Sequence, residues 1–261
     1  MPKLLRIERD APRSGLWRFW LDDPPRSNAL SPLLVSQLYA GLQEAFESDA
    51  RAIVIASSTE RFCAGFDLSD IDRVPDTELR ERFEAIESLL EAIRRAPLLT
   101  IALVRGAALG AGADLVAACD YRLGTSNARL AFPGIRFGVI LGTRHLTAVV
   151  GGQRAREILL EGKALDAAQA CAAGLLSGVY GADALDARAA EILTHAEALD
   201  AGALRALLRL TRDAASQRDL DELMRSTALP GLGERMRTHA RRAAQQRVAR
   251  RATTQGGGRR T

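Results

Sequence analysis

Four short apolar segments in the first half of the chain have the pattern of β-strands. Residues 3–9 and 15–21 read KLLRIER and GLWRFWL, and the stretch between them contains proline and glycine, which predicts a turn. Residues 51–58 contain a β-branched run, and residues 98–106 are almost continuously apolar, as in strands buried on both faces. The pattern predicts two strands joined by a turn, followed by two buried strands.

Helical spacing of apolar residues occurs between these strands and dominates the last third of the chain. Ser31 and Pro32 are typical of a helix N-cap and first helical position. Residues 77–95 carry a regular apolar face, and Ala96–Pro97 ends that helix. Further helices are predicted over 143–160, 166–173, 183–199, 201–215 and 217–228. Strand–turn–helix units followed by helices predict an α/β core with a helical extension.

Composition narrows the class of protein. The 261 residues are enough to bury a substantial core, and 47% hydrophobic with 26% charged residues is typical of a globular domain. No apolar run reaches the roughly 18–20 residues that span a bilayer, and the charged N-terminus does not resemble a secretory signal. Cys63, Cys119 and Cys171 lack metal-binding spacing and favour reduced thiols. We expect a cytoplasmic protein without membrane partner or metal.

The net charge of +4 comes from the C-terminal end. Residues 235–261 contain nine arginines and no acidic residue, whereas the rest of the chain has 27 basic and 32 acidic residues. No aromatic residue interleaves with these arginines, which argues against a nucleic-acid partner. We interpret residues 251–261 as a basic flexible tail. Contact of the arginines with a phosphate-bearing ligand or a neighbouring subunit is the alternative.

Two glycine turns carry the candidate chemistry. In LGAGADL, residues 109–115, Leu115 occupies the third glycine position of a dinucleotide fingerprint, and no acidic residue follows at the spacing that binds ribose. FCAGFDL, residues 62–68, is a similar turn after a similar strand. Two such turns facing each other would aim two backbone N–H groups at one oxygen, an oxyanion hole. The positive end of a helix starting near Ala111 would add to it.

Four stretches occur in the order found in the crotonase superfamily, also called the enoyl-CoA hydratase/isomerase family. They are PPRSNALS, RFCAGFDLSD, RGAALGAGADLVAACDYRLGTSNARLAFPGIRFGV and GGQRAREILLEGKALDAAQACAAGLLSGVYG. The chain resembles this family over about residues 5–225. The resemblance implies an α/β fold, a crotonase-type spiral of ββα units over residues 1–195, with a C-terminal α-helical trimerisation region over 196–250. It implies an acyl-CoA substrate, no permanently bound cofactor besides the coenzyme A of the substrate, and homotrimers or hexamers.

The resemblance assigns roles residue by residue. The backbone N–H groups of Phe66 and Ala111 correspond to the oxyanion donors, and Asp114 corresponds to the family's first catalytic glutamate. Phe66 stands where relatives often have a small residue, so it narrows the acyl pocket or is an ordinary core aromatic. The positions that bind coenzyme A and substrate correspond to Arg26, Ala64, Phe66, Asp67, Leu68 and Gly110. A free surface arginine and a helix N-cap are the alternatives for Arg26 and Asp67.

The chain departs from the family at the second catalytic glutamate. That position is Gly134, and the chain is about three residues shorter just afterwards. Hydration uses two positioned groups, each contributing typically 10²–10⁴-fold, so the sequence predicts weak hydratase activity. His145 is a candidate replacement because histidine titrates near neutral pH; a histidine hydrogen-bonded on a helix face is the alternative. Val139 stands near the nucleophilic aspartate of the dehalogenase branch, which argues against dehalogenation.

Asp114 is left with three roles: a general acid or base with raised pKa, a cap of the glycine turn, or a hydrogen-bond partner of the substrate. We predict a crotonase-type enzyme, similar to an enoyl-CoA hydratase or isomerase, that acts on an acyl-CoA thioester through an enolate. The alternatives are an acyl-CoA decarboxylase or C–C lyase of the same superfamily, and an acyl-CoA-binding protein with little or no catalysis.

Overall fold

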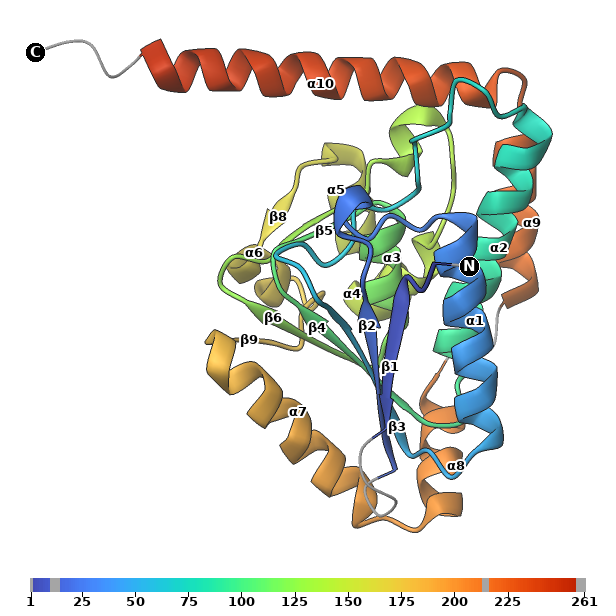
Figure 1. Cartoon of the computed structure of the whole chain (residues 1–261), viewed down its shortest axis with the longest axis vertical. Coiled ribbons are helices and arrows are strands. Elements are labelled where there is room, and N and C mark those ends of the chain that lie inside the picture. The colour runs from blue at the N-terminus through green and yellow to red at the C-terminus, as the bar shows by residue number, and fades with distance from the viewer. Residues whose placement is uncertain (1, 10–14, 213–215, 257–261) are drawn as a thin grey trace, which may run out of the picture.

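The computed structural model describes residues 2–9, 15–212 and 216–256, and its central element is a six-stranded sheet (Figure 1). The strand order is β1-β2-β3-β4-β6-β9. The first pair is antiparallel and all the others are parallel. The strands are β1 (Leu5–Arg9), β2 (Leu16–Leu21), β3 (Ala52–Ser57), β4 (Leu99–Val104), β6 (Tyr121–Thr125) and β9 (Gly178–Tyr180).

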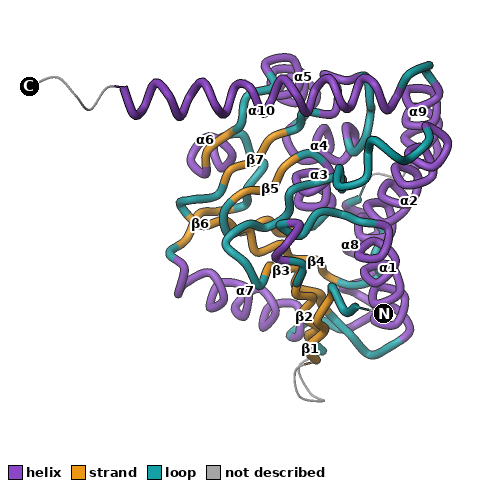
Figure 2. Tube along the Cα trace, turned by 45° about the horizontal axis from the view of Figure 1, so that its top comes forward, coloured by secondary structure: helices purple, strands orange, loops and turns teal. Residues whose placement is uncertain are grey.

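A second, smaller sheet has the order β5-β7-β8, with strands Ala107–Leu109, Arg129–Ala131 and Leu165–Asp166. Only two residues separate the end of β4 from β5, so the chain passes directly from the large sheet to the small one. The glycine turn after β5 therefore leads directly from the small sheet into the next helix (Figure 2).

Helices cover both faces of the large sheet, which is why β3 and β4 are buried at every residue. One core contains Phe19 and Ile55 together with apolar residues of α1 (Pro32–Glu47), α2 (Asp76–Arg94) and α3 (Ala111–Ala118). The other contains Val54 and Leu103 together with residues of α7 (Ala182–Glu197) and α8 (Ala201–Thr211). Figure 1 shows the sheet between α7 on one side and α1 and α2 on the other.

The predicted start of the first helix is confirmed in detail. The Ser31 hydroxyl accepts a hydrogen bond from the Leu34 N–H at 3.3 Å, and Pro32 is the first helical residue. The prediction of one helix over 143–160 is wrong. The segment forms α4 (Thr143–Val150) and α5 (Gly152–Glu161), because Gly151 adopts a φ of +78° and breaks the helical path.

The remaining elements are α6 (Ala167–Ala172), α9 (Ser216–Ala228) and the long α10 (Leu232–Gly256). The Asp76 carboxylate accepts hydrogen bonds from the N–H groups of Leu232 and Gly233, at 3.0 and 2.9 Å, and so fastens the start of α10 to α2. Figure 1 shows α10 crossing above the second sheet and extending past the body of the protein.

The helix α10 reaches Gly256, so residues 251–256 of the predicted basic tail are helical. The preceding stretch is rich in alanine, glutamine and arginine, which have high helix propensity. The rest of the predicted tail, 257–261, lies outside the described residues. Among the helices that the structure describes, none combines the length and apolar character that crossing a bilayer requires.

Candidate active site

The turns 62–68 and 109–115 lie against each other. The Cys63 N–H donates to the Ala107 carbonyl at 3.1 Å, and the Leu109 N–H donates to the Cys63 carbonyl at 2.9 Å. Gly65 has a φ of +92°, and a β-carbon there would be 2.3 Å from the Leu109 carbonyl oxygen and 3.3 Å from the Ala111 nitrogen. The backbone of one turn therefore approaches the other as closely as glycine permits.

A buried asparagine holds the first turn in place. The Asn28 side chain is fully buried, and its amide donates to the Ser57 hydroxyl at 2.8 Å and to the Phe62 carbonyl at 3.2 Å. The Leu30 N–H donates to the Gly65 carbonyl at 2.7 Å. The SNAL segment thus fixes the 62–68 turn, as expected for a buried polar group with all its partners in the protein.

Phe66 and Ala111 both line one cavity, as does Asp114. Ala111 is the first residue of α3, so its N–H has no acceptor within the helix. Among the described residues, neither Phe66 nor Ala111 donates a hydrogen bond from its backbone N–H to another backbone group. Two amides and the positive end of a helix are therefore available to an oxygen atom placed in this cavity.

The cavity has a volume of about 320 Å³ and is mainly apolar. Seven of the predicted site residues line it: Ala64, Phe66, Leu68, Gly110, Ala111, Asp114 and Gly134. Phenylalanine, leucine, isoleucine, valine and methionine side chains supply most of the remaining wall. No lysine or arginine of the described chain is among its lining residues. A ligand group held here meets mainly apolar surface, with the side chains of Asp114, Thr143 and His239 as polar groups.

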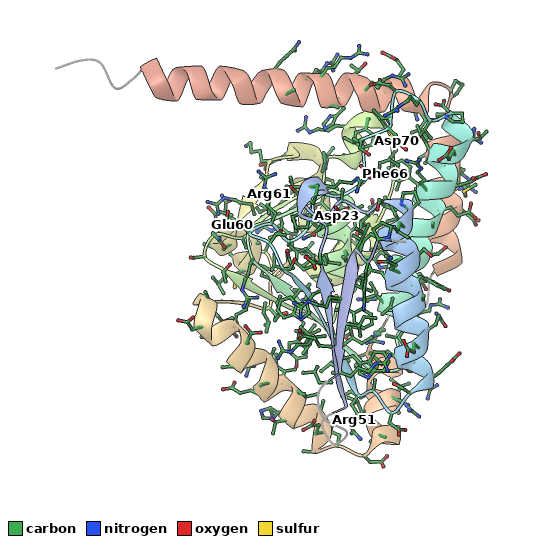
Figure 3. The ribbon with its side chains drawn as sticks, in the orientation of Figure 1. Asp23, Arg51, Glu60, Arg61, Phe66 and Asp70 are labelled. Carbon is green, nitrogen blue, oxygen red and sulfur yellow. The ribbon has the colours of Figure 1, made fainter. Side chains whose placement is uncertain are left out.

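The Phe66 ring lies beneath α10, where Figure 3 labels it. It stacks on Phe83 of α2, with ring centroids 4.3 Å apart and an angle of 24° between the planes. Such a pair contributes about 0.5–1.5 kcal/mol beyond the burial of its area. Phe66 therefore both packs against the core and forms part of the cavity wall, which combines the two alternatives that its position in the sequence predicts.

Arg26 and Asp67 do not line the cavity but pair with each other beside it. Arg26 is the last residue of the short helix η1 (Pro24–Arg26), and its Nε lies 3.6 Å from Asp67 Oδ2. Its side chain is 46% exposed, so its guanidinium is still accessible to a ligand phosphate. The prediction of Asp67 as a helix N-cap is wrong: its carboxylate accepts from the Ser69 N–H at 3.0 Å within a turn.

Gly134 lies at the start of the short helix η2 (Gly134–Phe137) and lines the cavity beside Pro133. A β-carbon there would meet the Val139 carbonyl oxygen at 3.2 Å, so a side chain fits with a small adjustment of its surroundings. The Arg136 guanidinium points away, and its Nη2 donates to the Glu161 carbonyl at 2.5 Å. Position 134 therefore supplies no acidic group to the cavity.

Asp114 is almost completely buried, with 4% of its surface exposed. Burial raises the pKa of its carboxyl group well above the usual value, and the charge of Glu87 raises it further. The protein environment therefore favours the protonated carboxyl over the carboxylate. Of the three roles open to Asp114, a buried acid or base with raised pKa agrees best with this environment.

His145 lies on the helix α4 in a buried environment. It is 2% exposed, its Nε2 lies 3.4 Å from Glu87 Oε1, and this nitrogen makes no hydrogen bond within the described residues. It is absent from the cavity wall. His145 thus lies on a helix, as the alternative expects, on a side of α4 that packs into the interior next to a buried carboxyl group.

Sequence reasoning missed two polar residues near the cavity. Glu87 lies four residues after Phe83 and three before Leu90, on the apolar face of α2, so helical spacing alone signals its burial. His239 of α10 lines the cavity, with its ring 5.1 Å from that of Phe137. Burial lowers the pKa of His239, and the charges of Arg136 and Arg242 add to this. The sequence around His239 gives no comparable signal.

Comparison with known proteins identifies the family. The family model described as enoyl-CoA hydratase/isomerase matches residues 13–228. The chain belongs to the enoyl-CoA hydratase/isomerase family. It is similar to an enoyl-CoA isomerase/hydratase of Mycosarcoma maydis, with 30% identity over 188 residues that cover 67% of this chain and 69% of that protein.

Two further relatives of this family agree. The mitochondrial enoyl-CoA hydratase domain-containing protein 3 of Danio rerio is 31% identical over 178 residues, which cover 67% of this chain and 62% of that protein. A solved structure of the enoyl-CoA hydratase/isomerase type from Bordetella parapertussis superposes with a TM-score of 0.87 at 36% identity, covering 91% of this chain and 98% of that one. The predicted crotonase-type α/β fold is confirmed.

Proposed function

We propose that this family member acts on an acyl-CoA thioester by stabilising its enolate. The thioester oxygen accepts hydrogen bonds from the backbone N–H groups of Phe66 and Ala111, and Asp114 handles the proton. The observation that supports this is the hydrogen-bonded contact of the two glycine turns, which brings Phe66, Ala111 and Asp114 to one cavity. Donors aimed at developing charge are worth about 2.7–4 kcal/mol each in a water-excluded site.

The apolar cavity wall favours a substrate whose acyl group is neutral. A substrate carboxylate would be buried without a cationic partner, because the described lining residues include no lysine or arginine. Phe66, Phe83, Phe132 and Phe137 suit aliphatic or aromatic carbon. The coenzyme A portion would leave the cavity past Arg26 and Leu68, whose positions match the resemblance. No other cofactor takes part in this proposal.

Gly134 favours a second candidate, C–C bond cleavage in a neutral acyl-CoA. Cleavage that produces an enolate needs fewer proton-transfer groups than hydration, and Gly134 removes one such group. Decarboxylation needs equally few groups, but its carboxylated substrate fits the uncharged wall less well. A protein that binds acyl-CoA without catalysis is the outcome that would contradict both candidates.

We also propose a homotrimer or a hexamer and a cytoplasmic location. The support is the family and the three free cysteines, of which Cys63 and Cys119 are buried. The name of the Danio rerio relative places that protein in mitochondria, so fractionation of the native host is the test of location. Light scattering of the purified protein tests the assembly.

Incubation with a panel of saturated, unsaturated and carboxylated acyl-CoAs in D₂O, followed by mass spectrometry, tests the function. One experiment reports hydration, isomerisation, C–C cleavage, decarboxylation and exchange of the α-proton. We expect conversion or exchange with neutral acyl groups, reduced at least about 100-fold in Asp114→Asn. Asp183→Asn, at an exposed site in the first turn of α7, is the matched control and should react like the wild type.

Three results would contradict the proposal. Measurable binding of acyl-CoA with no exchange or conversion would indicate a binding protein. Equal turnover by Asp114→Asn and the wild type would remove Asp114 from the chemistry. Turnover of carboxylated acyl-CoAs alone would reject the neutral acyl group and support decarboxylation.

A further inference from the structure

Glu87 is a buried carboxyl group on the core-facing side of α2, with 4% of its surface exposed. Its helical neighbours on this face, Phe83 and Leu90, are apolar and buried. A buried carboxylate is costly unless hydrogen bonds or a counter-charge compensate for the lost water. The groups that contact the Glu87 carboxyl therefore indicate its role.

Two groups of the 142–145 segment surround the Glu87 carboxyl. Its Oε2 accepts a hydrogen bond from the Gly142 N–H at 3.3 Å, and its Oε1 lies 3.4 Å from His145 Nε2. Neither Glu87 nor His145 is among the residues that line the cavity. The described chain has no group of three histidine, cysteine, aspartate or glutamate residues arranged to hold a metal ion. The Glu87 carboxyl therefore has one N–H donor, and the His145 imidazole lies next to it without a hydrogen bond from Nε2.

Gly142 connects this pair to Asp114. A β-carbon on Gly142 would lie 2.3 Å from Asp114 Oδ1, so the backbone that donates to Glu87 also touches the Asp114 carboxyl. Asp114 lines the cavity. Both carboxyl groups thus lie against one glycine, and a charge on either makes ionisation of the other less favourable. The Gly142 N–H donates to Glu87, which leaves the proton to Asp114.

We propose that Glu87 is a positioning residue that holds Asp114 in its protonated form, so that Asp114 is the proton donor to the enolate carbon. The inference rests on the proposed enolate chemistry. In the step, the enolate electron pair forms a new C–H bond at the α-carbon while the Asp114 O–H bond breaks. The carboxylate that remains regains its proton from water after the product leaves.

A protonated Asp114 limits the reactions that this site can catalyse. It fits enolates that arise from breaking a C–C bond or from addition to a double bond, because these need a proton at the α-carbon. It does not fit an isomerisation that begins with removal of a proton by Asp114. The arrangement therefore points to lyase chemistry rather than to an isomerase with one carboxylate.

Among the described residues, no titratable group besides Glu87 shifts the pKa of Asp114 by its charge. His239 faces it across the cavity from α10, and its lowered pKa keeps it neutral at pH 7. Cys63 packs behind Gly112 of α3, and burial raises its thiol pKa to about 12. Arg136 of η2 is turned toward the Glu161 carbonyl. Glu87 is the charge that acts on Asp114.

Infrared spectroscopy tests the inference without a substrate. The difference spectrum between the wild type and Asp114→Asn isolates the C=O stretch of the protonated carboxyl, which is followed from pH 5 to 10. We expect the wild type to show the band at neutral pH. In Glu87→Gln the band should disappear at a pH about one unit or more below the pH at which it disappears in the wild type. Glu87→Asp, which keeps the charge, should restore the wild-type curve. Glu81→Gln, at an exposed position of the same helix, is the matched control.

The kinetic readout is the pH profile of kcat on the acyl-CoA found in the panel. For a proton donor, kcat falls as pH rises through the pKa of Asp114, and Glu87→Gln moves this fall to lower pH with KM changed less than about twofold. A purely structural role of Glu87 would not move the profile.

Three results would overturn the inference: no carboxyl band at neutral pH, the same titration in Glu87→Gln as in the wild type, or a kcat that rises with pH. The wild-type titration alone decides whether Asp114 is protonated, even where Glu87→Gln does not fold. A band that shifts as expected while no acyl-CoA reacts would reject the proposed function only. Turnover with Asp114 ionised at neutral pH would reject this inference only.

Discussion

A β-carbon on Gly142 would lie 2.3 Å from Oδ1 of Asp114, so the backbone before α4 and the carboxyl group of α3 are in direct contact. Gly142 also has a φ of +62°, a conformation that other residues rarely adopt. The contact and the backbone conformation both require glycine. This position thus determines where the Asp114 carboxyl points.

The first prediction concerns this contact. Gly142→Ala should displace Asp114 and reduce kcat about 100-fold, because small misplacement of a reacting group has effects of this size. Gly151→Ala is the matched control, since Gly151 has a φ of +78° and no atom within 4 Å of an added β-carbon. Both variants should lose about 1–3 kcal/mol of unfolding free energy through backbone strain. Equal kcat in the two variants would contradict the steric explanation.

The second prediction is a gain in stability when Asp114 becomes uncharged. An unfolded carboxyl titrates near pH 3.9, whereas burial raises the pKa of Asp114 in the folded state. The folded state then binds more protons, so stability is lost as pH rises from about 4 through the raised pKa. Asp114→Asn removes this loss and should be more stable than the wild type by at least about 1 kcal/mol at pH 8.

Urea denaturation at several pH values between 5 and 8 measures this effect. The difference in unfolding free energy between Asp114→Asn and the wild type should grow with pH, while Asp183→Asn should give a constant difference. A constant difference for Asp114→Asn would show that its folded pKa is not raised.

The third prediction adds the missing carboxylate. Gly134→Glu should raise the rate of hydration of a short 2-enoyl-CoA at least about tenfold, since a second positioned acid–base group contributes about 10²–10⁴-fold where its geometry is right. The β-carbon fits with a small shift of the Val139 carbonyl. Loss of the conjugated thioester absorbance measures the rate. Gly134→Gln has the same size without the charge, and an equal gain there would exclude general acid–base catalysis.

The fourth prediction separates the side chain of Phe66 from its backbone. Phe66→Ala keeps the N–H donor and removes the ring that stacks on Phe83. We expect kcat within about threefold of the wild type and KM for small acyl groups raised about tenfold, as for lost packing of a few methylenes. The kcat/KM for bulkier acyl groups should rise relative to the kcat/KM for small ones. The exposed Tyr39→Ala on α1 is the control, and a collapse of kcat in Phe66→Ala would give the ring itself a part in catalysis.

Much of the fold is determined by local pattern. The N-cap at Ser31, the buried strand β3 and the helix α2 all follow from residues within a few positions of one another, so periodicity and capping predict them. The break at Gly151 is less predictable, because the apolar spacing continues through it and only the backbone conformation reveals the change. Boundaries that depend on one dihedral angle escape pattern analysis.

Motif order and residue identity are enough to reveal the family, the pair of glycine turns, the carboxyl group at Asp114 and the glycine at position 134. The approach of His145 to Glu87, the pairing of Arg26 with Asp67 and the place of His239 in the cavity wall follow only from the folded arrangement. Helical spacing says that Glu87 is buried, but not which charge it meets. That depends on how α2, α3 and α4 pack, and packing joins residues that are distant in the chain.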